Sequence, residues 1–113
     1  MRSTRGTASL VLALGLACGD AAAQWTALGR GDYIHTPYAD KASIRREGSM
    51  ARMSGMYDFS RQDFTPDGKA LYSSVVLREY DCAQRRVRLL SSIDFSGHMG
   101  GGEAVSTSVR VAR

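Results

Sequence analysis

Two cysteines and two histidines are the residues of this 113-residue chain best suited to nucleophilic chemistry. Cys82 stands between an aspartate, which opposes thiolate formation, and a pair of arginines, which favour it. A cysteine nucleophile also needs a base beside it, and neither His35 nor His98 belongs to a recognisable catalytic motif. The sequence therefore predicts no catalytic residue, and the chain is not expected to be an enzyme.

Cofactor and metal motifs are equally sparse. The glycines at 100–102 lack the Lys-Ser/Thr of a phosphate-binding loop and predict a turn. His98 and Met99 are adjacent, so they cannot bind the two faces of one haem, and there is no haem attachment motif. The scattered aspartates lack the spacing of a calcium loop. No cofactor and no metal site are expected.

The first residues predict export. Two arginines precede an apolar run over residues 10–17, and small residues at 21–23 follow it. This pattern is typical of a signal peptide, here residues 1–23 with cleavage after Ala23. The apolar run is far shorter than the roughly 20 residues that cross a bilayer, and no later segment is longer. A transmembrane helix is therefore not expected in residues 24–113.

A second reading of the same segment is a bacterial lipoprotein signal. Residues 14–18 resemble a lipobox in which Cys18 would be acylated, although the leucine stands one place too far from the cysteine. Either signal places the protein in an oxidising compartment. Cleavage after Ala23 would remove Cys18 and leave Cys82 as an unpaired cysteine. We expect it mainly buried at a strand end, with a minor disulfide-linked homodimer.

Residues 24–113 suffice for one modest core, so one domain is expected. The predicted cleavage removes two arginines and one aspartate, which lowers the net charge from +4 to +3. The remaining arginines alternate with acidic and apolar residues rather than forming a nucleic-acid-binding module. Nucleic acid is not an expected partner.

Frequent glycines and prolines divide the chain into short segments, the spacing expected of antiparallel strands joined by turns. The clearest strands are residues 71–81 and 86–95, which predict a hairpin. In the second strand Val87, Leu89, Ile93 and Phe95 alternate with other residues at the two-residue period. The predicted fold is mainly β, a single compact antiparallel β-sheet domain built as a meander of short strands.

The hairpin can be tested by its cross-strand pairs. A turn centred on residues 83–84 pairs Asp81 with Arg86, Glu79 with Arg88, Tyr80 with Val87, and Arg78 with Leu89. Opposite charges then meet on one face and apolar groups on the other, and such pairs stabilise a sheet. The arginine cluster is read as a solvated sheet face, with a ligand-binding basic patch as the alternative.

An earlier hairpin is predicted around a turn at Glu47 and Gly48, where glycine supplies a positive φ. Three methionines recur at intervals of three within residues 50–59, but Gly55 and Ser54 argue against a helix. This segment is read as a strand with methionines as flexible core filler. A methionine-lined copper site is the alternative, disfavoured because no histidine or cysteine lies at ligand spacing.

Several stretches together resemble one protein family. They are Trp25, YADKASIRREGSMARM at 38–53, YSSVVLREYDCAQRRVRLL at 72–90 and FSGHMGGGEAV at 95–105. In this order they resemble the surface-adhesin protein E-like family of small exported proteins from Gram-negative bacteria. The resemblance covers most of residues 24–113 and implies a compact antiparallel β-sheet domain, usually followed by a C-terminal helix.

The sequence departs from this family pattern in two places. Ser54 stands where relatives often carry an aromatic residue, and the chain stops at VSTSVRVAR. Relatives usually continue into a helix with a second cysteine. The resemblance therefore implies that the family's C-terminal helix is missing and that Cys82 has lost its partner.

The resemblance also implies a function, because family members of known function are adhesins that bind host matrix and plasma proteins. The chain is expected to be an exported, adhesin-like binding protein of the periplasm or outer-membrane surface. The alternative is a periplasmic structural or stress-related protein with no external ligand. The expected protein-binding residues are Arg78, Arg85, Arg86 and Arg88.

Overall fold

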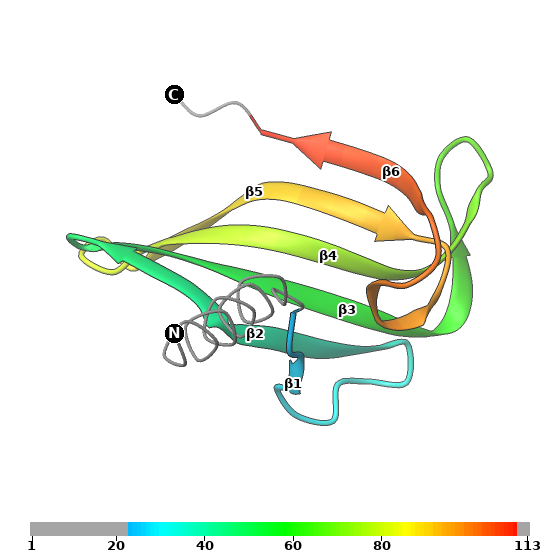
Figure 1. Ribbon diagram of the computed structural model, residues 1–113, viewed down its shortest axis with the longest axis horizontal. Coiled ribbons are helices and arrows are strands. Elements are labelled where there is room, and N and C mark those ends of the chain that lie inside the picture. The colour runs from blue at the N-terminus through cyan, green and yellow to red at the C-terminus, as the bar shows by residue number, and fades with distance from the viewer. Residues whose placement is uncertain (1–22, 111–113) are drawn as a thin grey trace, which may run out of the picture.

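A computed structural model describes residues 23–110, which form one six-stranded antiparallel sheet (Figure 1). The strands follow one another across the sheet in sequence order. They are β1 (Thr26–Ala27), β2 (His35–Glu47), β3 (Met50–Phe64), β4 (Ala70–Asp81), β5 (Arg86–Phe95) and β6 (Ala104–Val109), with a 3-10 turn, η1 (His98–Gly100), between the last two. This confirms the predicted β meander. The predicted signal peptide, apart from Ala23, and Cys18 lie outside the described residues.

The strands are longer than the sequence punctuation predicted. β2 has 13 residues and β3 has 15, and β3 runs through Gly55 without a break. Gly55 does not end the strand, because it stays paired with Ala39 of β2 and Val76 of β4. A Cβ at Gly55 would be 3.6 Å from Arg78 Nη1 and 3.4 Å from a Val76 methyl carbon. These are ordinary van der Waals distances, so a small side chain would also fit at this position.

The β4–β5 hairpin has the predicted register. Asp81 pairs with Arg86, Glu79 with Arg88, Tyr80 with Val87, and Arg78 with Leu89. The predicted pairing is therefore confirmed, and Glu79 and Asp81 share a face with the two arginines because side chains alternate along a strand.

A β-bulge interrupts this register beyond Leu89. Leu77 pairs with Ser91 while Arg78 pairs with Leu89, so Leu90 is an extra residue in β5. An extra residue moves every later side chain to the other face. The prediction that Val87 and Leu89 share an apolar face with the later apolar residues of β5 was therefore wrong.

The buried apolar core is small and lies on the three strands β2, β3 and β4. It consists of Ala39, Met56, Leu71 and Val76, and Met56 is 1% exposed. This confirms the core-filler role for that methionine, whereas Met50 is only half-buried. Within residues 23–110, no helix is long and apolar enough to cross a membrane.

The segment between β5 and β6 folds back over β3 and β4 (Figure 1). Ser73 on β4 is fully buried and joins both ends of η1: its hydroxyl donates to the Gly97 carbonyl at 2.6 Å and accepts from the Gly100 N–H at 2.8 Å. β6 then returns along β5, a strand that the sequence did not predict.

Candidate functional site

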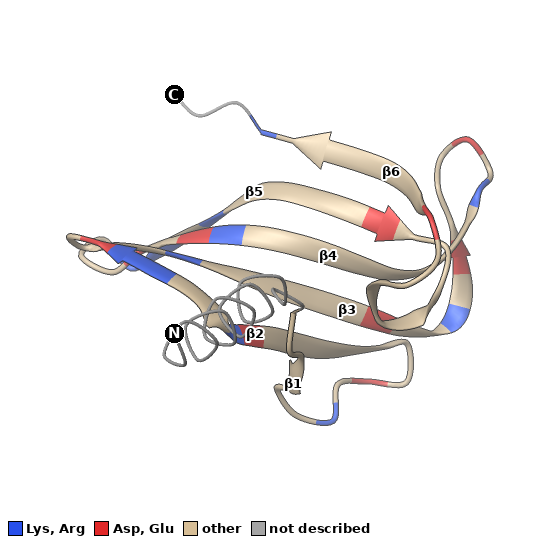
Figure 2. Cartoon of the chain, in the orientation of Figure 1, with Lys and Arg blue, Asp and Glu red and all other residues tan. Residues whose placement is uncertain are grey.

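Two hairpin turns lie together at one end of the sheet. The β2–β3 turn and the β4–β5 turn are joined by a hydrogen bond from the Cys82 N–H to the Ser49 carbonyl, 2.9 Å long. Figure 2 shows that basic residues gather at this end. We call residues 45–52 and 78–88 the basic end. Its charged residues are Arg45, Arg46, Arg52, Arg78, Arg85, Arg86 and Arg88, with Glu47, Glu79 and Asp81.

Glu79 is the centre of this cluster. Its side chain is only 8% exposed, and it lies between an arginine of β3 and an arginine of β5. Arg88 Nε donates to Oε1 at 2.9 Å and Arg88 Nη2 lies 2.7 Å from the same atom, while Arg52 Nε donates to Oε2 at 3.1 Å. Glu79 was expected on a solvated face, but these two arginine side chains cover it.

The hydrogen bonds from Arg88 and from Arg52 lower the pKa of Glu79, because they stabilise its charged form. The two arginine side chains themselves remain about half exposed, at 48% and 56%. Glu79 thus restrains two guanidinium groups whose remaining N–H groups are open to solvent. Restrained, exposed guanidinium groups suit the binding of carboxylates.

Two adjoining surface hollows of about 370 and 390 Å³ lie over this arrangement. They share Met50 and Glu79, so together they form one groove across the basic end. The groove is lined by Arg45, Arg46, Glu47, Met50, Ala51, Arg52, Glu79, Asp81, Arg86, Val87 and Arg88. Most of its lining residues are charged, and Met50 is an apolar residue that lines both hollows.

The four arginines singled out from the sequence do not share one surface. Arg86 and Arg88 line the groove, and Arg85 is exposed in the adjacent turn with a positive φ of 54°. Arg78 is on the opposite face, because adjacent residues of a strand point to opposite sides. There its Nη2 donates to the Tyr57 hydroxyl at 2.7 Å, and its Cζ lies 5.4 Å from the centre of that ring.

Sequence reasoning missed the contribution of the other hairpin, above all Arg52. The structure pairs Arg52 with Glu79 across β3 and β4. That register could not be counted from the β3–β4 turn, because a large irregularity lies between the Asp58–Ser73 and Asp63–Leu71 pairs. The signal available in the sequence was the presence of basic residues on both sides of the predicted turn, Arg45 and Arg46 before it and Arg52 after it.

Cys82 differs from its prediction. It was expected to be mainly buried at the strand end, but β4 ends at Asp81, and Cys82 is exposed in the turn. It forms no disulfide among the described residues. The strand alternation that predicted burial does not extend into a turn.

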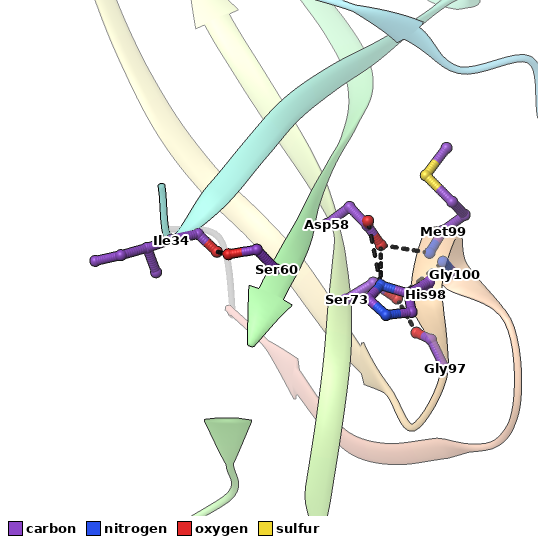
Figure 3. A network of polar contacts seen from close by, with 8 residues as sticks. All are labelled: Ile34, Asp58, Ser60, Ser73, Gly97, His98, Met99 and Gly100. Atoms are coloured by element: carbon purple, nitrogen blue, oxygen red, sulfur yellow. Dashed lines mark hydrogen bonds and ion pairs between the residues drawn. The ribbon is translucent and has the colours of Figure 1, made fainter. Parts of the chain in front are cut away.

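A second polar cluster lies at the other end of the sheet, where Asp58 meets η1 (Figure 3). Asp58 Oδ1 accepts from the Met99 N–H at 2.7 Å, and both carboxylate oxygens lie 3.2 Å from His98 Nδ1. The His98 ring also lies 4.5 Å from that of Tyr72. These contacts fix the loop, and no group of three metal-ligating residues occurs in the described part of the chain.

Comparisons with known proteins agree with this fold. A family model described as surface-adhesin protein E matches residues 25–113. No curated protein sequence matches the chain. Among solved structures, the crystal structure of protein E from non-typeable Haemophilus influenzae is similar, with a TM-score of 0.57 and 12% sequence identity. The match covers 83% of this chain and 63% of that one. At this identity the likeness concerns the fold, whereas the family match covers most of the sequence, and the chain therefore belongs to the surface-adhesin protein E family.

Proposed function

We propose that this protein is an exported, adhesin-like protein of the cell envelope that binds host extracellular-matrix or plasma proteins through its basic end. The family match over residues 25–113 is the observation that carries the proposal. The groove supports it, because it offers half-exposed guanidinium groups that Glu79 holds on neighbouring strands. A site built from strand residues needs little ordering when it binds, which favours affinity.

The proposal includes a route to the surface. Residues 1–23 act as a signal peptide and residues 24–113 form the exported domain. Binding rather than catalysis is proposed, since the clustered residues are arginines and carboxylates engaged with one another. N-terminal sequencing of the protein purified from cells would test the cleavage: Gln24 at the N-terminus agrees, and an acylated Cys18 would make it a lipoprotein.

The binding proposal is tested with the full chain, expressed with its own N-terminal segment and purified as the cell processes it. We expect binding to at least one protein of an immobilised matrix and plasma panel. Joint replacement of Arg85, Arg86 and Arg88 by Glu should weaken that binding, because it reverses the charge of the contact surface. Arg88→Glu also removes a partner of Glu79 and places a carboxylate opposite it, so some loss of stability is expected with the loss of binding. Arg61→Glu, which reverses one charge at the other end of the sheet, is the control.

Circular dichroism of each variant would show whether the β fold is kept. Loss of binding in the triple variant with an unchanged spectrum supports the basic end as the contact surface. Wild-type protein that binds nothing on the panel at micromolar concentration would contradict the proposal. That result would favour a periplasmic structural or stress-related protein.

A further inference from the structure

We infer that the groove at the basic end binds an acidic peptide segment, whose carboxylates contact Arg52 and Arg88 and whose apolar side chain lies against Met50. Glu79 acts as a positioning residue that holds the two arginines in place. This inference rests on the proposed function, because it names the class of partner that the same surface would take.

The arginine geometry is the first reason. Arg52 and Arg88 use Nε, and Arg88 also one Nη, to contact Glu79, at distances between 2.7 and 3.1 Å. Each guanidinium has five N–H donors, so several remain free in each half-exposed side chain. Arginine binds carboxylates in a planar, two-pronged geometry that lysine cannot provide, and every basic residue of the groove is an arginine.

The composition of the groove is the second reason. It favours a peptide over a densely charged polymer as the ligand. Three carboxylates line the groove with the arginines, and Met50 lies where the two hollows join. A uniformly sulfated glycan would meet repulsion from the carboxylates and gain nothing from the apolar atoms. A peptide with alternating acidic and apolar side chains can place carboxylates at the arginines and an apolar side chain against Met50, and its spaced charges meet less repulsion from the groove's own carboxylates.

The inference is tested with a short synthetic peptide of alternating Glu and Leu and a matched Gln–Leu peptide, both titrated against the full-chain protein at low and high salt. We expect the Glu peptide to bind and the Gln peptide not to, with affinity falling as salt rises. Arg52→Gln or Arg88→Gln should weaken binding by about tenfold, the size of one charge-assisted hydrogen bond. Arg61→Gln, an equal charge change at the other end, should leave binding unchanged.

The Glu79→Gln variant tests whether Glu79 positions the two arginines or only contributes its charge to the groove. This replacement makes the groove more positive, so attraction alone would tighten binding of an acidic peptide. If Glu79 positions the arginines, the same variant binds more weakly although its charge favours binding. Tighter binding by a variant with an unchanged circular dichroism spectrum would overturn the positioning role.

Four other outcomes overturn the inference as a whole. Heparin binding that needs Arg52 and Arg88, with no peptide binding, would make the groove a polyanion site. Association between copies at low salt that blocks the peptide would make it a self-association site. Binding to matrix proteins that is unaffected by Arg52→Gln and Arg88→Gln would refute the inference while the proposed function stands. Failure of both peptide and matrix binding would refute both.

Discussion

Glu79 is the residue on which the candidate site depends. An ion pair between a carboxylate and an arginine on neighbouring strands ordinarily adds little to the stability of the fold when both side chains are exposed. Here it has two arginine partners from different strands and little solvent contact of its own. The pair with Arg88 could be predicted from the hairpin, whereas Arg52 required the three-dimensional structure.

The lowered pKa of Glu79 predicts a specific pH dependence of stability. Because its pKa is lower in the folded than in the unfolded state, its ion pairs stabilise the fold above the unfolded pKa. That stabilisation is lost as the pH falls through the folded pKa. The melting temperature of wild type should therefore exceed that of Glu79→Gln near neutral pH, and the difference should shrink as the pH falls below the ordinary pKa of a glutamate, about 4.3.

The melting-temperature comparison isolates Glu79 because the other carboxylates with lowered pKa, Asp32 and Asp67, are the same in both proteins. Thermal unfolding followed by circular dichroism at several pH values is sufficient. A difference that stays constant or grows on acidification would contradict the arrangement described for Arg52 and Arg88.

Exposure of Cys82 changes what its thiol should do. We expect a thiol reagent to label the native protein about as fast as the unfolded protein, because no strand covers the turn. A minor disulfide-linked dimer should appear on non-reducing gels and disappear in Cys82→Ser. Labelling that occurs only after unfolding would mean that the Cys82 thiol is buried in the native protein.

At the scale of the element, the β4–β5 register could be predicted because its turn is short. The β3–β4 register could not, because its pairing is irregular. The β4–β5 pairs could be counted outwards from residues 83–84 until the bulge at Leu90. The β3–β4 pairs could not, because the irregularity beyond Asp58 changes the count. β6 is short and polar, so its residues gave too little hydrophobic alternation to predict a strand.

The element that closes the far end of the sheet depends on Ser73. Replacement of Ser73 by Ala would leave the Gly97 carbonyl and the Gly100 N–H without their partner. We expect a loss of about 1–3 kcal/mol in the free energy of unfolding, measured by urea denaturation. Ser108→Ala in β6, where the side chain is exposed, is the matched control. Equal stability of the two variants would mean that the hydroxyl does not hold η1.

Across the whole molecule, charge is divided between the two ends of the sheet (Figure 2). The basic end carries seven arginines and three acidic residues, whereas the opposite end carries three basic and six acidic residues. The residues of this acidic end are Arg30, Asp32, Asp58, Arg61, Asp63, Asp67, Lys69, Asp94 and Glu103. The mild overall charge of +4 conceals this division, which only the topology reveals. Such a distribution would orient the molecule towards an acidic partner.

The most direct measurement of the central claim is adhesion of intact bacterial cells to immobilised matrix proteins. Cells that produce wild-type protein are compared with cells that produce equal amounts of the Arg85, Arg86 and Arg88 to Glu variant, with protease applied to intact cells to show surface exposure. We predict that protease removes both proteins from intact cells and that only wild type promotes adhesion. A protein protected until the outer membrane is opened, or equal adhesion by the two strains, would contradict an adhesin that acts through its basic end.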